Sequence, residues 1–319
     1  MAARAWGSRE QKATDEIFFS NDAVSLCLLV HRRAKTMRVI DFRAGPSNRK
    51  RQLVLKLAQR EGVEKVYTLV ERDEVGTWTK LGFTKEGNIP GFYKRSDAFL
   101  LGCSADAPIQ SETRISIGSP LVPPPAEEED EEIDDTPEEP SAAHERAEKT
   151  VTQAKKIAKE LADKPLPIAR VAVAKEADVR KAADKAVRAG RALTTFEPFG
   201  RDVVRSWYTV TARGGFELHA SVESQACFGN AFLELLTGPR NEAEKLATVS
   251  AVRALCEELT EAGVVSCFSL TPSDDPVLGA AFAFSGFRRT GLLKSHLVVG
   301  GERKDAIIWS RKLANPTAE

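Results

Sequence analysis

The sequence predicts an α/β (α+β) protein with two mixed-sheet domains, the N-terminal one abridged, joined by a disordered acidic linker. The first observation is a unit that appears twice, over residues 62–104 and 263–313. Each copy consists of Gly-Val, an apolar strand, an acidic loop, a short helix, Gly-Phe, a turn with glycine and a final apolar strand. The length of 319 residues also favours two domains, and an acidic, proline-rich run separates the two copies. We therefore expect a flexible tail over residues 1–15, the abridged domain over 16–104, the linker over 105–148 and the full domain over 149–319.

The first domain begins with two apolar, β-branched runs that predict a strand pair, over residues 23–33 and 36–44. The break that follows contains Ser47 and Asn48, either of which can cap a helix over residues 49–60. The remaining elements expected here are a strand, a short helix and a last strand, over residues 63–70, 73–80 and 97–101.

The linker contains the run PPPAEEEDEEIDDTPEEP, which cannot bury enough apolar surface to offset the entropy of ordering. Although the formal net charge of the chain is zero, residues 105–150 carry 3 Lys and Arg against 14 Asp and Glu, whereas residues 1–104 carry 19 against 12. Two interpretations stay open: a tether that folds back on a mildly basic domain, or a solubilising spacer.

The second domain is expected to begin after a helix near residues 148–163. A strand over 168–174 and a helix over 175–190, which Gly190 can terminate, come first. Three strands of an antiparallel meander, a long helix and a further strand then follow, over residues 207–211, 216–222, 228–236, 241–261 and 264–270.

The composition, with 42% hydrophobic and 29% charged residues, suits a globular protein in water. The five cysteines form no Cys-x-x-Cys pair and mostly lie in apolar segments, which favours free thiols in a reducing compartment. The N-terminus lacks the apolar core of a secretory signal, and no segment is apolar enough to span a bilayer. We therefore expect a cytoplasmic protein without a membrane partner.

Several kinds of site are not indicated. Among His, Cys, Asp and Glu we find no metal-ligand spacing, and neither a Ser-His-Asp order nor a nucleophile elbow occurs. Basic residues do not interleave with aromatic ones, and the linker would repel phosphate, so we expect no nucleic-acid partner.

The repeated unit, above all AAFAFSGFRRTGLLKSHLVVGGERKDAIIWSRKL, resembles the C-terminal part of the GNAT acyltransferase fold. The order of elements over residues 166–315 is similar to a complete GNAT domain. The segment GFTKEGNIPGFYKRSDAFLL resembles the N-terminal part of beta-lysine N-acetyltransferases, which also join an abridged half to a full one. The resemblance implies that acetyl-CoA lies in a splayed opening between two central strands. It also implies that backbone N–H groups of a glycine-containing loop hold the diphosphate at a helix N-terminus.

The chain departs from that pattern in the loop at residues 239–247. Ala243 and Lys245 stand where the resemblance places glycines. Glu242 and Glu244 would put carboxylates beside a diphosphate, at a cost of about 1 kcal/mol or more each.

The matching region of the first domain, residues 45–51, also lacks the glycine pair. It is basic, with Arg49, Lys50 and Arg51 in succession. Two interpretations stay open: these residues attract an anion, or they form the solvated first turn of a helix.

The resemblance also implies a tyrosine that protonates the departing thiolate. The positions that match it hold Trp78 and Phe282, and an acid replaces the asparagine that often precedes the helix, at Glu71 and Asp275. Both domains therefore lack the same chemical groups.

Glu234 is the candidate general base, because a glutamate on this strand is common in the superfamily. Burial among Leu233 and Leu235 would raise the pKa of its carboxyl, which suits a base that takes a proton from an ammonium. The alternative is an outward-facing residue on a half-exposed strand.

Acetyl-CoA is the cofactor that the resemblance implies, with its pantetheine arm on the main chain of one strand and its diphosphate at the following helix. The candidate cofactor-binding residues are Leu233, Leu235, Leu236, Arg240 and Asn241. The candidate substrate-cleft residues, each of which could instead be structural, are Glu217, His219, Phe282, His296 and Tyr93.

Two functional hypotheses follow. In the first, the protein is an N-acetyltransferase that moves an acetyl group from acetyl-CoA to a primary amine of an amino acid or a protein lysine, aligned by the cleft. In the second, the protein is a catalytically inactive tandem module that binds a protein partner, since fold does not fix activity.

Overall fold

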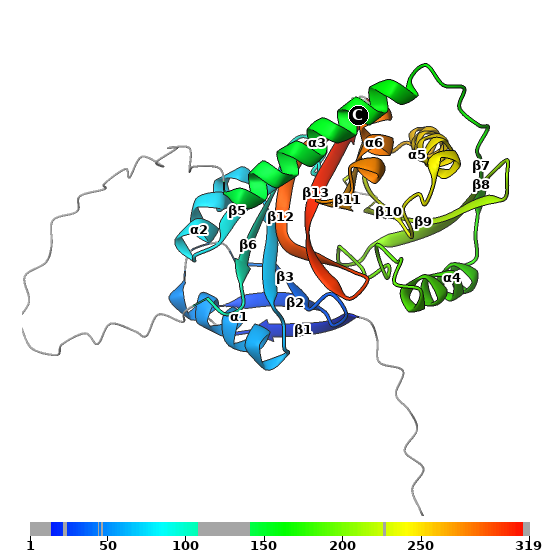
Figure 1. Cartoon of the computed structure of the whole chain (residues 1–319). Coiled ribbons are helices and arrows are strands. Elements are labelled where there is room, and N and C mark those ends of the chain that lie inside the picture. Colours follow the sequence, from blue (N-terminus) through cyan, green and yellow to red (C-terminus); the bar gives the residue numbers. More distant parts are fainter. Residues whose placement is uncertain are drawn as a thin grey trace, which may run out of the picture.

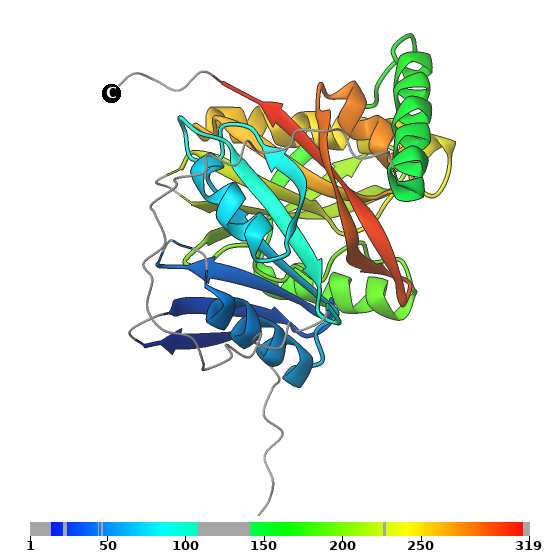
Figure 2. The same ribbon diagram turned by 90° about the vertical axis from the view of Figure 1, so that its left-hand side faces the viewer.

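A computed structural model describes residues 14–21, 24–43, 45, 47–107, 141–225 and 228–314. Their strands form one 13-stranded mixed sheet (Figure 1; Figure 2), in the order β1-β2-β3-β4-β6-β5-β12-β13-β11-β10-β9-β8-β7. The predicted α/β class is confirmed. The division into two domains stays a prediction, because the N-terminal half (residues 14–107) and the C-terminal half (residues 141–314) build this sheet together.

The N-terminal half alternates strands with short helices. Its elements are β1 (Thr14–Ser20), β2 (Ser25–His31), β3 (Thr36–Asp41), α1 (Asn48–Arg60), β4 (Lys65–Val70), the 3-10 helix η1 (Arg72–Glu74), α2 (Val75–Lys80), β5 (Thr84–Ile89) and β6 (Ala98–Ser104). The C-terminal half consists of α3 (Ala142–Leu161), β7 (Arg170–Val173), α4 (Glu176–Arg188), β8 (Val204–Ala212), β9 (Phe216–Gln225), β10 (Asn230–Leu235), α5 (Glu242–Glu261), β11 (Ser266–Pro272), α6 (Pro276–Phe284), β12 (Arg288–Val299) and β13 (Glu302–Lys312).

Three elements differ from the sequence-based expectation. Strand β1 begins at Thr14, inside the expected tail, and β5 forms from a polar segment because it pairs with β6 along its length. Helix α3 begins at Ala142, so the last residues of the expected linker are helical. The cause is tertiary burial, since Ala147 of this first stretch is fully buried. The linker residues 108–140 and Cys227 lie outside the described residues.

The two halves share one strand order. In the N-terminal half the order is β1-β2-β3-β4-β6-β5, and in the C-terminal half it is β8-β9-β10-β11-β13-β12. In each half a single parallel pair, β3–β4 or β10–β11, is connected by a helix, α1 or α5, as parallel strands require. Strands β5 and β12 are the last strands of the two orders, and they pair with each other where the halves join.

Two glycines allow β5 and β12 to meet. Gly87 of β5 pairs with Gly291 of β12 in antiparallel register. A Cβ atom on Gly87 would lie 2.6 Å from the Cα of Gly291, and one on Gly291 would lie 2.5 Å from the Cα of Gly87. Because real Cβ atoms do not approach a backbone this closely, the junction requires glycine at both positions.

The junction continues into a buried interface between the halves. Tyr67 and Phe92 of the N-terminal half pack in one cluster with Phe199, Phe232 and Phe268 of the C-terminal half. The rings of Phe232 and Phe268 stack at 4.8 Å, the close aromatic spacing found in well-packed cores. Apolar burial and strand pairing therefore join the halves in the same place.

A buried ion pair beside the junction also joins the halves. The Lys65 ammonium donates to the Glu86 carboxylate and to the carbonyl of Lys294 in β12. Burial lowers the pKa of Lys65 and raises that of Glu86, and each side chain opposes the shift of the other by stabilising its charged form.

Helices cover one face of the C-terminal half. Residues of α3, α5 and α6 pack on Leu233 and Leu235 of β10, whereas Phe232 of the same strand points into the interface between the halves. Helix α3 lies along α6 (Figure 2), where Gly279 lets Ala154 approach closely. Because side chains alternate along β10, Glu234 lies on the same face as Phe232, toward the interface between the halves.

The glycine junction gives a first prediction. Gly87→Ala should lower the free energy of unfolding by about 1–3 kcal/mol or more, because the added methyl meets backbone that cannot move aside. Urea unfolding measures the effect. The matched control is Gly76→Ala in α2, where a Cβ meets nothing within 4 Å and helix propensity favours alanine by about 1 kcal/mol. Equal stability of the two variants would contradict the junction.

Candidate functional site

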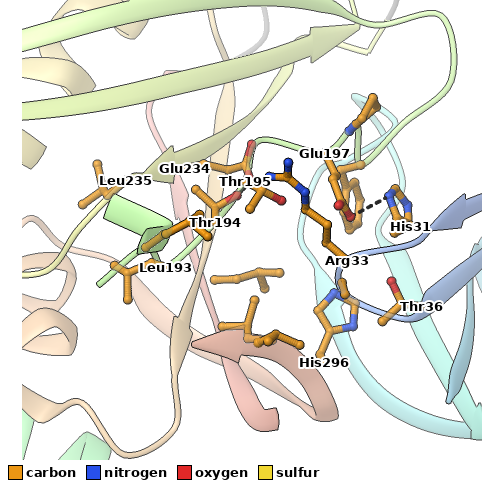
Figure 3. Close-up of a pocket in the computed structure, with 18 of the residues that line it drawn as sticks. His31, Arg33, Thr36, Leu193, Thr194, Thr195, Glu197, Glu234, Leu235 and His296 are labelled. Atoms are coloured by element: carbon orange, nitrogen blue, oxygen red, sulfur yellow. Dashed lines mark hydrogen bonds and ion pairs between the residues drawn. The ribbon is translucent and has the colours of Figure 1, made fainter. Parts of the chain in front are cut away.

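A cavity of about 370 Å³ lies between the two halves. The N-terminal half contributes His31, Arg33 and Thr36 at the β2–β3 turn and Tyr67 on β4. The C-terminal half contributes the loop after α4, the ends of β10 and β11, and the β12–β13 hairpin (Figure 3). Figure 3 shows Arg33 extending across the cavity toward Thr195. The volume is within the range of small-molecule sites.

The opening between β10 and β11 leads into this cavity. Among the described residues of both strands, their parallel ladder runs from Asn230↔Ser266 to Phe232↔Phe268 and ends there. β10 continues to Leu235 with β9 as its only sheet partner, which leaves its other edge without a ladder. Phe232, Glu234 and Leu235 of β10 and Leu270 of β11 line the cavity.

Glu234 is buried beside the cavity, so the alternative of an outward-facing side chain is wrong. The hydroxyl of Thr194 donates to its Oε1 at 2.5 Å, and Arg205 and Ser221 donate to its Oε2 at 2.9 and 3.0 Å. Burial raises the pKa of Glu234, the direction expected from its apolar neighbours, and the charge of Arg205 opposes that rise. Its role as general base stays a prediction.

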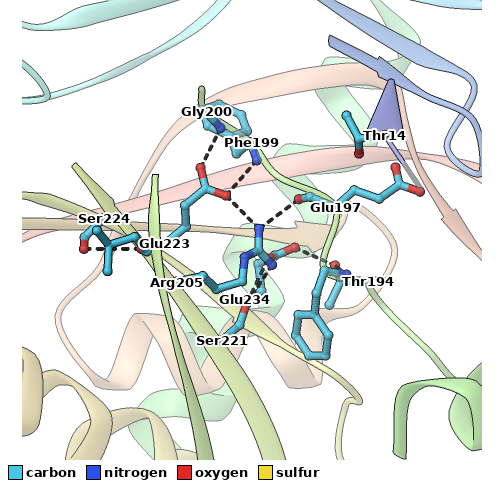
Figure 4. Close-up of polar contacts among 12 residues, drawn as sticks. Thr14, Thr194, Glu197, Phe199, Gly200, Arg205, Ser221, Glu223, Ser224 and Glu234 are labelled. Atoms are coloured by element: carbon cyan, nitrogen blue, oxygen red, sulfur yellow. Dashed lines mark hydrogen bonds and ion pairs between the residues drawn. The ribbon is translucent and has the colours of Figure 1, made fainter. Parts of the chain in front are cut away.

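The same arginine fixes the cavity wall (Figure 4). Arg205 donates to Glu223 at 2.7 Å and to the carbonyl of Glu197 at 3.0 Å. Glu223 in turn accepts the backbone N–H groups of Phe199 and Gly200, at 2.8 and 2.5 Å. Residues 194–200 have no regular secondary structure, so these charged hydrogen bonds determine where the loop lies.

Three residues of the cavity wall carry buried polar atoms without a partner. Within the described part of the chain, His31 Nε2, Glu197 Oε1 and His296 Nδ1 have no hydrogen-bond partner. His31 Nδ1 lies 3.4 Å from Glu197 Oε2 and 3.3 Å from the hydroxyl of Thr14. His296 packs edge-on to Tyr67, and burial holds its pKa well below the usual histidine value, so its ring is neutral.

The start of α5 does not form an open anion site. Asn241 caps the helix by accepting the N–H of Glu244 at 3.0 Å. The Glu244 carboxylate accepts the backbone N–H of Arg240 at 2.8 Å and pairs with its guanidinium, which lowers the pKa of Glu244. Carboxylates of the chain therefore stand where the resemblance implies a phosphate. Cofactor binding by Arg240 and Asn241 stays a prediction.

The basic run of the N-terminal half has a structural role at its centre. Lys50 is 1% exposed, and its ammonium donates to Asp41 and to the carbonyls of Arg43 and Gly45. Both interpretations offered for Lys50, an anion-attracting residue and a solvated first turn, are therefore wrong, because its donors are satisfied inside the fold. Ser47 caps α1, as predicted.

The predicted cleft residues are scattered. His296 lines the cavity, whereas Glu217 and His219, 2.9 Å apart, line a separate depression of about 540 Å³ beside α4. Phe282 is 1% exposed and packs against Phe287 in the core, so its placement in a cleft is wrong. Tyr93 packs edge-on against Phe92 and Phe228, so it has the structural role that was the alternative to a place in the cleft.

Sequence reasoning missed the residues that the N-terminal half supplies. His31 and Arg33 lie at the end of a predicted strand, over residues 23–33, and Glu197 lies between two predicted elements, with no functional role expected for any of the three. Polar side chains at the ends of apolar strands can indicate candidate site residues in a sequence. Whether these residues lie close together depends on the junction of the halves, which the sequence does not reveal. No cluster in the described residues has the groups to hold a metal ion. None of the described helices is long and apolar enough to cross a membrane.

Comparison with known proteins yields structural similarity without sequence similarity. No family model and no curated protein matches the chain. Among solved structures, the ribosomal-protein-S18-alanine N-acetyltransferase of Escherichia coli is 15% identical, with a TM-score of 0.33, over 46% of this chain and 95% of that one. Spermidine N-acetyltransferase of Vibrio cholerae, in complex with CoA and spermine, is 10% identical, with a TM-score of 0.38, over 46% of this chain and 96% of that one.

A putative acetyltransferase of Sphaerobacter thermophilus is 14% identical, with a TM-score of 0.37, and the match covers 46% of this chain and 94% of that one. Similarity at this level establishes neither a family nor a function for the chain. Membership of the GNAT superfamily and the beta-lysine resemblance therefore stay predictions.

The arginine of the cavity wall gives a second prediction. Arg205→Met should cost about 3–5 kcal/mol of folding stability, because it leaves Glu234 and Glu223 buried without a cation. With Arg205 gone, the pKa of Glu234 rises further. The folded state then binds a proton more tightly than the unfolded state, and stability should increase as the pH falls from 7 to 5.

Urea unfolding at both pH values measures this effect. Arg253→Met is the matched control, because its pair with Glu257 is exposed and such pairs contribute about 0–1 kcal/mol. A loss for Arg205→Met no larger than that of the control would show that the network does not hold the loop.

Proposed function

We propose that this protein transfers an acetyl group from acetyl-CoA to a small primary amine bound in the cavity between its halves. The observation that carries the proposal is the end of the β10–β11 ladder at Phe232↔Phe268, beside a cavity lined by Glu234. An opening between parallel strands that enters a cavity with a carboxylate in its wall can bring an extended thioester arm and an amine to one point.

The residues of the opening fit the thioester arm. Leu233 and Leu235 lie beyond the last β10–β11 pair, on the edge of β10 without a ladder, and Phe232 and Leu270 supply apolar walls. Acetyl-CoA would supply the acetyl group as an activated thioester. An unpaired strand edge offers peptide N–H and C=O groups to an amide-containing ligand in the manner of an added strand.

The residues at the start of α5 do not fit the diphosphate end in the way that the resemblance implies. Asn241 and Glu244 already satisfy backbone donors there, and Glu242 adds a further carboxylate. We therefore expect the arm, and not a backbone cradle, to provide most of the affinity.

The cavity suits an ammonium group. Glu197 and Glu234 put two carboxylates in its wall and Thr194 and Thr195 add hydroxyls, against the one guanidinium of Arg33. Its volume of about 370 Å³ admits a free amine or a single lysine side chain. The acceptor is accordingly an amino acid or a lysine side chain, in keeping with the sequence-based hypothesis.

A second function, binding of a protein partner without catalysis, has its own support. The Glu244 carboxylate occupies the start of α5, and Phe282 is buried in the core at the position where the resemblance implies a tyrosine. Under this alternative the cavity between the halves would be a consequence of their packing.

Calorimetry with acetyl-CoA and a thiol-release assay with L-lysine, ornithine and putrescine test the proposal. We expect sub-millimolar binding of acetyl-CoA and amine-dependent release of thiol. Leu270→Trp should reduce turnover at least tenfold by filling the opening, whereas Val204→Trp, on an exposed position of β8, should not. No binding at 1 mM acetyl-CoA would refute the enzyme and leave the binding module.

A further inference from the structure

We propose that His31, oriented by Glu197, accepts the proton of the amine's ammonium group in the cavity. The inference rests on the proposed function and names a pair of residues for its proton transfer. His31 ends β2 in the N-terminal half, and Glu197 lies in the loop after α4 in the C-terminal half. The N-terminal half would then supply part of the chemistry.

Burial and contact define the pair. The side chains of His31 and Glu197 are 5% and 9% exposed, and His31 Nδ1 lies 3.4 Å from Glu197 Oε2. A carboxylate only accepts hydrogen bonds, so this contact favours the proton on Nδ1. Nε2 then carries a lone pair, as in the histidines that act as bases beside a carboxylate.

Nε2 has no competing partner among the described residues, and neither has Glu197 Oε1. A buried polar atom without a hydrogen bond costs about 1–3 kcal/mol, so two on one pair indicate that something else satisfies them. A ligand ammonium has three N–H donors and would satisfy a lone pair and a carboxylate oxygen together.

Glu234 is a weaker choice for the same step. Its two oxygens already accept hydrogen bonds from Thr194, Arg205 and Ser221. Oε1 keeps one free lone pair, but Thr194 already donates to it at 2.5 Å, and the charge of Arg205 favours the ionised carboxylate over a protonated one. We therefore assign to Glu234 the positioning of Thr194, at the start of the wall loop that also carries Glu197.

The groups around His31 are compatible with transient charge on its ring. Glu197 and the Thr14 hydroxyl face Nδ1. Arg33, two residues from His31, lines the same cavity. Burial holds the pKa of His296 well below the usual value, and the charges of Lys65, His31 and Arg303 add to this shift, so its ring is neutral. His296 is thus a poor proton acceptor, and the Glu197 carboxylate stabilises the charge on His31.

The step balances without a further reactant. One N–H bond of the ammonium breaks, its proton bonds to His31 Nε2, and the electron pair of that bond stays on the amine nitrogen. The ring becomes an imidazolium next to the Glu197 carboxylate, and the neutral amine can attack a carbonyl.

The test uses the full chain with four variants: His31→Gln, His31→Ala, Glu197→Gln and, as the control, His144→Gln on α3, which does not line the cavity. At saturating amine we expect His31→Gln to lower kcat about 100-fold or more, with the KM for acetyl-CoA unchanged. Glu197→Gln should lower kcat less. Imidazole added to His31→Ala should restore part of the rate, which a structural role would not produce.

Nuclear magnetic resonance of ring-labelled histidine gives a readout that needs no turnover. Addition of L-lysine without acetyl-CoA should shift the ring signal of His31 and leave that of His144 unchanged. Wild-type turnover together with a His31→Gln rate equal to wild type, no imidazole rescue and an unshifted His31 signal would overturn this inference and leave the proposed function intact. Absence of wild-type turnover would refute the proposed function, and an unshifted signal in that case would also refute the amine site.

Discussion

The contact of two bare backbones, Gly87 on β5 and Gly291 on β12, is the constraint on which the rest of the structure depends. It joins two equivalent strands of two halves with the same strand order into one sheet. The join brings the β2–β3 turn against the loop after α4, and the cavity lies where they meet. A side chain at either glycine would separate these surfaces, so the site and the fold have one geometric requirement.

Carboxylates carry most of the electrostatic organisation, and their partners decide what each one does. Glu223 and Glu234 are held by Arg205 and fix the wall loop. Glu244, paired with Arg240, closes the start of α5. Glu197 differs from these three because one of its oxygens has no partner among the described residues. Glutamate side chains thus fix a loop, cover a helix start and, in our proposal, orient a base.

Local patterns predicted local structure well. The strands rich in apolar residues, the helix that Ser47 caps and the long helix after the meander all follow from periodicity and capping. Glu234 was singled out by the resemblance, and its apolar neighbours correctly indicated burial and a raised pKa. His31 and Glu197 were missed as a pair because a single sequence contains no sign that two turns distant in the chain meet. The prediction that Phe282 lines a cleft was wrong because alignment with a motif does not show which face of a helix is buried.

In the proposed function the amine binds between the halves, against residues of both. A crystal structure of the protein with a thioether analogue of acetyl-CoA and L-lysine tests it most directly. We expect the pantetheine arm along Leu233–Leu235 of β10 and the amine nitrogen within hydrogen-bond distance of His31 Nε2 or Glu197 Oε1. An amine bound outside the cavity, or an arm that avoids the opening between β10 and β11, would contradict it.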